Sequence, residues 1–421
     1  MVIAVVGAGG REHAIIKALK KNPELTKIYA LPGNGGIARD AECADVKATD
    51  IPGVVAFCKA HDVDYVVVAP DDPLVLGMVD ALEEAGIPAF GPHKNAALIE
   101  GSKAFSKDLM KKYGIPTADY EIFTNPEDAL SYVKTCKLPV VVKADGLALG
   151  KGVLIAATRE EAEEAVKTIM LDKKFGKSGD QVVIEEFLEG PEVSVLSFTD
   201  GKTLVPMVSS MDHKRALDGD EGLNTGGMGT IAPNPYYTPE IAKTCMETIF
   251  LPTMEAMNKE GRQFRGCLYF GLMLTKDGPK VIEYNCRFGD PETQVVLPLL
   301  DTDLYTIMRA VTEGRLADID VKWKDGAACC VILASGGYPG AYESGYEISG
   351  IEDCGSVYVA GAQMRQGKLC TKGGRVLGVT ATGKTLLEAV KNAYAEAEKI
   401  HFRDQHMRRD IGKRALKALG M

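Results

Sequence analysis

Short apolar runs alternate with helical patterns over the first part of the chain. The runs VIAVVG, KIYALPG, VDYVVVAP and IPAFGP begin at Val2, Lys27, Val63 and Ile87. Patterns with helical spacing lie between them, for example over residues 12–21 and 74–84. Strands that alternate with helices form right-handed βαβ units, so we expect a parallel sheet within residues 1–100.

The remaining pattern predicts mixed α/β and α+β structure. Ser102 is a good N-cap for a helix that runs to Tyr113, where Gly114 and Pro116 follow. Later strands are expected over 140–143, 152–156, 181–186 and in AACCVILAS, VYVAGAQ and RVLGVTAT, with helices over 160–171 and 386–401. These patterns divide the chain into an N-terminal unit of residues 1–100, a core of 101–122 and 190–320, a small inserted unit of 123–189 and a C-terminal unit of 321–421.

Composition and charge narrow the possible partners. The net charge of -9, without a long run of like charges, argues against nucleic acid or an acidic membrane as partner. The apolar runs are strand-length, far short of the roughly 20 residues of a membrane span, and no signal peptide is evident. Ten cysteines without C-x-x-C spacing indicate free thiols in a reducing compartment. We therefore expect a soluble cytoplasmic protein that acts on small molecules.

Two glycine motifs resemble nucleotide-binding fingerprints but lack their context. Gly7-Ala8-Gly9-Gly10 follows the first strand, yet no acid follows the second strand to hold a nicotinamide ribose. A tight turn, or binding of another phosphorylated ligand together with the loop 33–36, remain the two interpretations. The segment 378–385 satisfies the Walker A pattern, but Gly378 interrupts a strand, and a helix cap at Thr382 or Thr385 explains the segment better.

KADGLALGKG, over residues 143–152, is more informative. A strand ends on Lys143, a glycine-rich loop with Lys151 follows, and another strand begins. Such a loop can cover nucleotide phosphates with backbone N–H groups and lysine charges. A plain hairpin turn is the alternative, although three glycines make it entropically costly.

The segment VVIEEFLEGPEVSV, over residues 182–195, can form the complementary half of a nucleotide site. An apolar strand runs into Glu185-Glu186 and Phe187-Leu188, and Glu192 follows after a turn. This hinge can offer backbone groups and an apolar face to an adenine, while Glu192 takes ribose hydroxyls. An edge strand with solvated acids is the alternative.

VIEYNCRFGDPETQ, from Val281, carries the strongest signal. Alternation along a strand places Ile282 and Tyr284 on one face and Glu283, Asn285 and Arg287 on the other. A carboxylate and an amide oxygen suit a Mg²⁺ ion that bridges ATP phosphates, and an arginine suits a carboxylate substrate or phosphoryl charge. A surface ion-pair ladder is the alternative.

A long polar stretch begins at Ser209. It contains Asp212-His213-Lys214-Arg215 and, after a gap, Thr225-Gly226-Gly227-Met228-Gly229. Long loops without periodicity are usually functional or disordered, so we expect a substrate loop. His213 as a general base is a further hypothesis.

These residues together resemble a known family. GGREHA, IEGSKAF, KADGLALGKG, IEEFLEGPE, SMDHKR with NTGGMG, RFGDPETQ and RDIGKRA are similar to the motifs of phosphoribosylamine-glycine ligases over nearly the whole chain. The sequence departs from the family at Ala8 and at Ala69-Pro70-Asp71, both in the N-terminal unit. Another ATP-grasp ligase of nucleotide metabolism, a nicotinamide dehydrogenase and a silent nucleotide-binding scaffold are the competing hypotheses.

The resemblance implies an ATP-grasp fold whose lid is 123–189 and whose core is 101–122 with 190–320, between an N-terminal parallel-sheet domain and a C-terminal mixed α/β domain. It implies a monomer or weak homodimer that joins glycine to 5-phosphoribosylamine through glycyl phosphate, with ATP and Mg²⁺ or Mn²⁺. The implied ATP-binding residues are Lys103, Lys143, Gly146, Gly150, Lys151, Gly152, Glu185, Glu186, Phe187, Leu188 and Glu192, and the implied metal ligands are Glu283 and Asn285. The implied substrate residues are Gly9, Gly10, Asn34, Asp212, Lys214, Gly226, Gly227, Arg287 and Asp290, of which Asp212, Lys214 and Arg287 are also catalytic.

Overall fold

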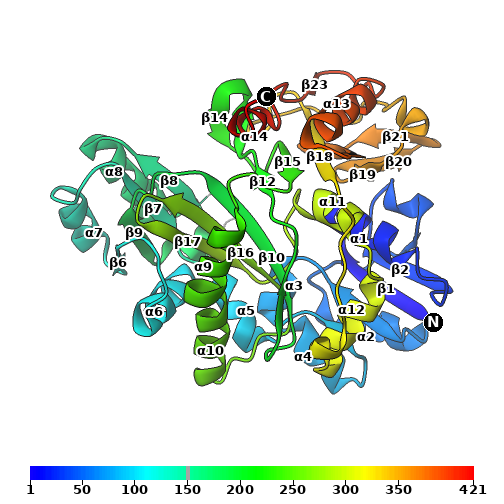
Figure 1. The fold of residues 1–421 in the computed structure, drawn as a ribbon, viewed down its shortest axis with the longest axis horizontal. Coiled ribbons are helices and arrows are strands. Elements are labelled where there is room, and N and C mark those ends of the chain that lie inside the picture. The colour runs from blue at the N-terminus through cyan, green and yellow to red at the C-terminus, as the bar shows by residue number, and fades with distance from the viewer. Residues whose placement is uncertain (148–151) are drawn as a thin grey trace.

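The protein is described by a computed structural model that covers residues 1–147 and 152–421 (Figure 1). Within these residues the strands form one five-stranded, one six-stranded and two four-stranded sheets, together with two two-stranded ribbons. The helices are α1 Gly10–Leu19, α2 Ile51–Ala60, α3 Asp71–Leu76, α4 Met78–Glu84, α5 Lys94–Gly101, α6 Lys103–Tyr113, α7 Pro126–Val133, α8 Arg159–Val166, α9 Pro239–Cys245, α10 Leu251–Lys259, α11 Thr293–Val296, α12 Leu304–Glu313, α13 Leu386–Ala397 and α14 Lys413–Ala418.

The N-terminal sheet is parallel, which confirms the prediction from its alternating pattern. Its order is β3–β2–β1–β4–β5, with bounds β1 Val2–Gly7, β2 Lys27–Pro32, β3 Glu42–Cys43, β4 Tyr65–Val68 and β5 Ala89–Phe90. The helix expected over 74–84 is two helices, α3 and α4, which meet at Gly77 with φ +98°. A left-handed residue cannot continue a helix, so the glycine divides the apolar pattern.

Helix α6 has the predicted bounds. The Ser102 hydroxyl accepts the Phe105 N–H at 3.1 Å, and Gly114 ends the helix with φ +67°. Lys103 and Lys107 lie one turn apart on this helix, near the region between the two four-stranded sheets.

The small sheet after α6 is antiparallel, in the order β6–β9–β7–β8. Its strands are β6 Tyr120–Phe123, β7 Val140–Ala144, β8 Val153–Ala156 and β9 Val182–Glu186. Helices α7 and α8 cover one face and share a core of small and branched residues with it, including Val133, Val142, Val166 and Ile184. In Figure 1 this unit projects to one side of the molecule, away from the N-terminal sheet.

The central sheet is antiparallel, in the order β11–β10–β16–β17. Its strands are β10 Glu192–Thr199, β11 Leu204–Pro206, β16 Gly266–Thr275 and β17 Gly278–Asn285. The register of β16 and β17 shifts between Gly271 and Leu272, which pair with Glu283 and Val281 and leave Ile282 in a bulge. Val281 therefore joins Tyr284 in the core, and the expectation that Ile282 shares the buried face is wrong.

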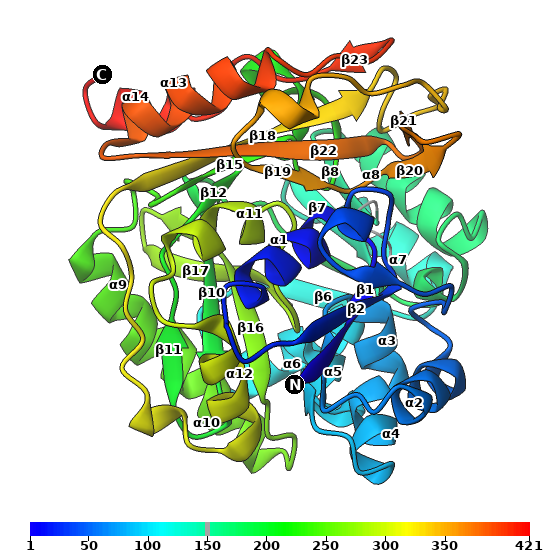
Figure 2. The same ribbon diagram turned by 90° about the vertical axis from the view of Figure 1, so that its right-hand side faces the viewer.

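The six-stranded sheet combines strands from distant parts of the chain. Its path is β12–β15–β18–β22–β19, and β23 pairs with β18. The bounds are β12 Met211–Asp212, β15 Gly229–Ala232, β18 Ala327–Ser335, β19 Val357–Val359, β22 Arg375–Gly383 and β23 Gln405–His406. In Figure 2 this sheet lies across the top of the molecule, with α13 above it and α1 and α11 below.

Two ribbons stand apart from these sheets: β13 Arg215–Leu217 with β14 Glu221–Asn224, and β20 Ala362–Arg365 with β21 Lys368–Thr371. The run VYVAGAQ is thus divided between β19 and β20. The Walker-like segment is the end of β22 followed by Thr385, whose hydroxyl accepts the Glu388 N–H at 3.2 Å and caps α13. Its interpretation as a helix cap is confirmed.

Candidate active site

Three polar side chains share one face at the end of β17. Glu283, Asn285 and Arg287 are partly exposed, while the intervening Tyr284 and Cys286 are buried. The alternation predicted for this segment is therefore correct from Glu283 onward. Burial raises the pKa of Glu283, but Lys214, Lys143 and Lys103 outweigh that effect, and the net pKa lies below its usual value. The site thus holds an ionised carboxylate beside an amide oxygen, two of the hard oxygen donors that a divalent ion prefers.

Lys214 connects this face to β10, which β16 separates from β17 in the central sheet. Its Nζ lies 3.2 Å from Glu192 Oε2 and 3.8 Å from Glu283 Oε1. The Glu192 carboxylate, followed by that of Glu283, raises the pKa of Lys214. The three side chains keep between 34% and 46% of their exposure, so a ligand can reach all of them.

A buried charge cluster lies behind this face. The Glu185 carboxylate pairs with both Lys143 and Lys107, and each of the three side chains is at most 5% exposed. Lys143 Nζ also donates to the Ile282 carbonyl at 3.2 Å, which ties β7 to β17. The Glu185 side chain thus holds the Lys143 ammonium group, and the assignment of Glu185 to adenosine stays a prediction.

The other predicted nucleotide residues lie around these lysines. Lys103 Nζ donates to the Gly146 carbonyl at 2.7 Å, and burial lowers the pKa of Lys103. Gly152 accepts the Ala144 N–H at 2.8 Å at the start of β8. Glu186 lies 3.7 Å from Lys280, and Phe187 and Leu188 follow β9, all partly exposed. Gly150 and Lys151 lie outside the described residues.

Arg287 is anchored from below by a buried carboxylate. Its Nη2 donates to Glu100 Oε1 at 2.8 Å and to Asn285 Oδ1 at 3.2 Å, and Asp71 Oδ2 is 4.0 Å away. The second oxygen of Glu100 accepts the Cys286 N–H at 2.7 Å. The Arg287 side chain keeps 18% of its exposure, so part of the guanidinium still faces the site.

A second group of predicted residues meets next to the first. A Cβ atom placed on Gly9 or Gly10 would lie 3.4 or 3.7 Å from an oxygen of Asp290, so the two N-terminal glycines adjoin that carboxylate. A Cβ atom on Gly227, which has φ +113°, would lie 2.6 Å from Asp212 Oδ1, so only glycine allows this close approach. Arg375 completes the group: its guanidinium lies 3.3 Å from Asp290 Oδ2 and donates to the Gly226 carbonyl at 2.7 Å.

Asn34 has a different role from the one implied by resemblance. Its amide nitrogen donates to the carbonyls of Ala8 and Val359, both at 2.8 Å. Its amide oxygen accepts the N–H groups of Gly36 and Ile37 at 2.8 and 2.9 Å. All hydrogen-bonding positions of the amide are thus used, and the Asn34 side chain links the turn at Ala8 and the loop 33–36 to Val359 of β19.

Two carboxyl groups lie close to the glycine loop: Glu292, which is buried, and Asp212, which is partly buried. Burial, together with the Glu292 carboxylate, raises the pKa of Asp212 well above its usual value, and burial also raises the pKa of Glu292. The Tyr269 hydroxyl donates to Glu292 Oε1 at 3.2 Å. The pair thus binds protons more strongly than carboxyl groups in water do.

Replacing Glu292 with glutamine tests this burial. The pKa of Glu292 is higher in the folded than in the unfolded chain, so the wild type loses stability as the pH rises from about 4 through the raised value. Glutamine does not ionise, so this loss is absent from the variant, and its amide oxygen can still accept the hydrogen bond from the Tyr269 hydroxyl. We expect a free energy of unfolding about 1–2 kcal/mol above wild type at pH 8 and equal to it near pH 4, measured by urea denaturation. An equal difference at both pH values would contradict the assignment.

His213 is a structural residue. It is 1% exposed, its Nε2 accepts the Gly412 N–H at 3.1 Å and its Nδ1 donates to the Gly229 carbonyl at the same distance. Burial, with Arg408 and Arg414 nearby, lowers the pKa of His213 to about 4. Both ring nitrogens are occupied by backbone groups, which argues against the hypothesis of a general base.

Four residues of this region were not identified from the sequence: Glu100, Lys107, Glu292 and Arg375. Lys107 had a usable signal, because it lies one helical turn after Lys103. Glu292 lies inside RFGDPETQ but after the strand, where alternation no longer applies. Glu100 and Arg375 come from distant segments, and no local pattern indicates where they pack.

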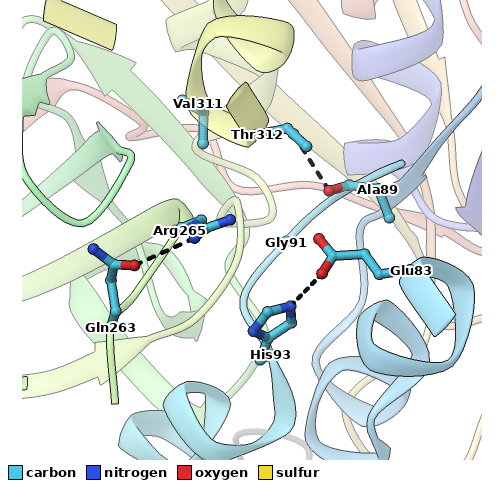
Figure 3. Close-up of a pocket in the computed structure, with 8 residues that line it drawn as sticks. All are labelled: Glu83, Ala89, Gly91, His93, Gln263, Arg265, Val311 and Thr312. Carbon is cyan, nitrogen blue, oxygen red and sulfur yellow. Dashed lines mark hydrogen bonds and ion pairs between the residues drawn. The ribbon is translucent and has the colours of Figure 1, made fainter. Parts of the chain in front are cut away.

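A small pocket elsewhere contains none of the predicted residues (Figure 3). It has a volume of about 10 Å³, room for roughly one water molecule. His93 pairs with Glu83 at 2.7 Å on one side, and Arg265 donates to Gln263 at 3.3 Å on the other.

No helix in the described part of the chain is long and apolar enough to span a bilayer.

Comparison with known proteins explains why these motifs occur together. Three family models match the chain: the N domain of phosphoribosylglycinamide synthetase over residues 1–100, its ATP-grasp (A) domain over 101–293 and its C domain over 328–414. The chain belongs to the phosphoribosylglycinamide synthetase family. The resemblance inferred from the motifs is thereby confirmed, and so is the ATP-grasp fold.

Individual family members agree over nearly the full length. Phosphoribosylamine–glycine ligase of Clostridium acetobutylicum is 49% identical, over 98% of this chain and 100% of that protein. The crystal structure of the ligase of that name from Thermotoga maritima superposes with a TM-score of 0.86 at 37% identity, covering 98% of this chain and 100% of the other. A biotin carboxylase from Campylobacter jejuni, at 13% identity and a TM-score of 0.74 over 96% and 92% of the two chains, shares the fold alone.

Proposed function

We propose that this protein joins glycine to 5-phosphoribosylamine at the expense of ATP, giving glycinamide ribonucleotide, ADP and phosphate. The observation that carries the proposal is the convergence of Glu283, Asn285, Lys214 and Arg287 beside the Lys143–Glu185 pair. The family relationship supports the choice of substrates, because relatives named phosphoribosylamine–glycine ligase align with nearly the whole chain.

In this proposal ATP lies between the small antiparallel sheet and the central sheet. Lys103 and Lys143 supply positive charge for its phosphates, and the glycine-rich loop that begins at Gly146 covers them. The backbone from Glu186 to Leu188 takes the adenine, and Glu192 takes ribose hydroxyls. Glu185 keeps Lys143 in position through their buried ion pair.

Glu283 and Asn285 fit a divalent ion by donor chemistry, and we assign Mg²⁺ or Mn²⁺ to them. When bound, the ion would neutralise charge on the nucleotide phosphates. Lys214 Nζ lies 3.8 Å from an oxygen of the same Glu283 carboxylate. The lowered pKa of Glu283 keeps the carboxylate ionised and ready to coordinate near neutral pH.

The reaction has two steps at one site. A glycine carboxylate oxygen attacks the γ-phosphorus of ATP, the bond to the bridging oxygen breaks, and ADP leaves. The amine of phosphoribosylamine then attacks the glycyl carbonyl carbon, phosphate leaves, and the amine loses a proton. Arg287 and Lys214 stabilise the negative charge that develops on the transferred group, while Asp212 and the loop Gly226-Gly227 orient glycine.

The phosphoribosylamine is assigned to the group around Gly9, Gly10 and Asp290. The Gly9 N–H donates to Glu12 Oε2 at 2.6 Å, but the other backbone N–H groups at the start of α1 suit its phosphate, and the Asp290 carboxylate suits its amine or hydroxyls. This group adjoins Asp212, so the two substrates would meet there.

The test is ADP release with glycine and freshly generated phosphoribosylamine. We expect release that requires both substrates and a divalent ion, with glycinamide ribonucleotide as product. Formate or bicarbonate in place of glycine tests the rival ATP-grasp reactions, and release with either would replace the proposal. Binding of ATP without ADP release under any of these conditions would indicate a silent scaffold.

We also propose that the enzyme works in the cytoplasm as a monomer or weak homodimer. The free cysteines support that location. Sedimentation at micromolar concentration measures the oligomeric state.

A further inference from the structure

The substrate loop contains a hairpin that no larger sheet supports. Among the strands of residues 1–147 and 152–421, β13 and β14 pair only with each other. Leu217 and Leu223, its two leucines, are 47% and 66% exposed, and only Ala216 is buried. Two-stranded hairpins are marginally stable in water, so other contacts must hold this one.

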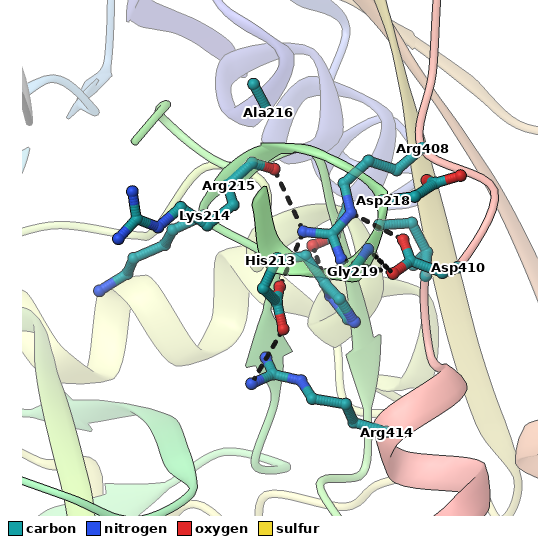
Figure 4. A network of polar contacts seen from close by, with 12 residues as sticks. His213, Lys214, Arg215, Ala216, Asp218, Gly219, Arg408, Asp410 and Arg414 are labelled. Carbon is teal, nitrogen blue, oxygen red and sulfur yellow. Dashed lines mark hydrogen bonds and ion pairs between the residues drawn. The ribbon is translucent and has the colours of Figure 1, made fainter. Parts of the chain in front are cut away.

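Those contacts come from the end of the chain (Figure 4). Arg408 is 1% exposed, and its Nη1 donates to the Arg215 carbonyl at 3.1 Å and to Asp220 Oδ1 at 2.9 Å. Its Nε and Nη2 donate to the two oxygens of Asp410 at 2.8 and 2.9 Å. One guanidinium thus joins the first strand of the hairpin, its turn and the C-terminal segment.

The neighbours of Arg408 reinforce this junction. We call residues 406–414 the C-terminal clamp. Its further contacts with the loop are His406 Nε2 to the Ala216 carbonyl at 2.8 Å, Arg409 N–H to Asp218 Oδ1 at 2.7 Å, Gly219 N–H to Asp410 Oδ2 at 2.9 Å, Gly412 N–H to His213 Nε2 at 3.1 Å and Arg414 Nη1 to Asp220 Oδ2 at 3.4 Å. Every position from His213 to Asp220 except Lys214 and Leu217 is therefore held by the clamp through its backbone or side chain.

The two ends of the hairpin carry the groups that face the site. Lys214 immediately precedes β13, and Thr225 immediately follows β14. The Thr225 N–H and hydroxyl donate to the Lys214 carbonyl at 2.7 and 2.8 Å, which links the two ends. Movement of the hairpin would consequently displace both Lys214 and the Gly226-Gly227 turn.

We propose that Arg408 is a positioning residue for the ligase reaction: through the C-terminal clamp it fixes the hairpin so that Asp212, Lys214 and Gly226-Gly227 meet glycine in the productive orientation. This inference rests on the proposed function for its substrate. Within the described residues Arg408 has no direct contact with those assigned to ATP, so its main effect is on glycine and on turnover. Lys214, which pairs with Glu192 at 3.2 Å, links the hairpin to the nucleotide residues.

Arg408→Lys is the informative variant. Lysine keeps the charge but lacks the planar fork that contacts Arg215, Asp220 and Asp410 together. We expect the KM for glycine to rise and kcat to fall, each about tenfold, because small misplacement of positioning groups is costly. The KM for ATP should rise less, since only the contact of Lys214 with Glu192 connects the displaced groups to the nucleotide residues that the structure describes. Arg409→Lys is the matched control, since its side chain pairs with exposed Glu398 at 3.0 Å and its contact with Asp218 uses the backbone N–H, which the substitution keeps.

Amide hydrogen exchange of the substrate-free protein provides an independent readout. In Arg408→Lys we expect faster exchange over residues 213–226, with unchanged exchange in the N-terminal sheet and in β16 and β17. A role in general stability alone would instead lower the melting temperature and leave the KM for glycine of the folded enzyme unchanged. Asp220→Asn weakens the same junction from the hairpin side and replaces Arg408→Lys if that variant does not fold.

The outcomes separate the two proposals. Unchanged exchange over 213–226, or faster exchange with wild-type KM for glycine and kcat, overturns the positioning role. If wild-type enzyme releases no ADP with glycine and phosphoribosylamine, the proposed function fails, and the exchange comparison still decides whether Arg408 holds the hairpin.

Discussion

Replacing Glu283 with glutamine is expected to lower kcat by about 10³-fold, because the neutral amide cannot hold a divalent ion or balance the charge around the phosphates. The fold should tolerate the change. The Glu283 side chain is 34% exposed and 3.8 Å from Lys214, so the loss of this contact costs about 1 kcal/mol or less. ADP release at saturating ATP and glycine, with thermal unfolding alongside, measures both quantities.

Glu255→Gln is the matched control for that variant. Glu255 is a carboxylate on α10 that pairs with Lys259 at 2.7 Å and is assigned no role in the site; its side chain is 66% exposed, against 34% for Glu283. It should retain wild-type kcat. A concentration series of Mg²⁺ or Mn²⁺ adds a second readout, since Glu283→Gln should raise the half-saturating concentration of the ion. Turnover above a tenth of wild type in Glu283→Gln would refute the metal assignment.

Arg287→Ala should reduce both turnover and stability. We expect kcat to fall by about 10²–10³-fold, since the guanidinium stabilises charge on the transferred group. The structure adds a cost that the sequence alone does not indicate: Glu100, whose side chain is 7% exposed, would lose its charge partner. Leaving a buried charge unpaired costs about 3–5 kcal/mol, so urea denaturation should show a large loss of stability.

The double variant Arg287→Ala/Glu100→Gln separates the two effects. Glutamine is neutral and its amide oxygen can still accept the Cys286 N–H, which Glu100 accepts at 2.7 Å. We expect most of the lost stability to return while kcat stays low. Recovery of turnover together with stability would mean that Arg287 only supports the fold.

The sequence was most informative where function requires local order. Parallel strands repeat apolar runs, so the N-terminal sheet could be predicted, and alternation over Glu283–Arg287 placed three functional groups on one face. Ser102 and Thr385 were recognisable as caps because a capping side chain reaches only a few residues along the chain.

Non-local features escaped prediction for a physical reason. The bulge at Ile282 depends on the register with β16, which Val281 and its neighbours do not encode by themselves. The pairing of Glu185 with Lys107 and Lys143 joins α6, β7 and β9, and that of Glu100 with Arg287 joins residues 187 positions apart. Each of these contacts is set by the packing of whole elements.

The pairing of β15 with β18 also bears on how the protein is made. Residues 1–320 contain every group assigned to ATP. Without β18, however, one edge of β15 (Gly229–Ala232) would be unpaired, and its four residues, all buried in the complete protein, would be open to association with other chains. During translation the domains of a protein generally fold from the N-terminus onward. The nascent chain should therefore acquire a nucleotide site first and a working glycine loop only after β18 and Arg408 have left the ribosome.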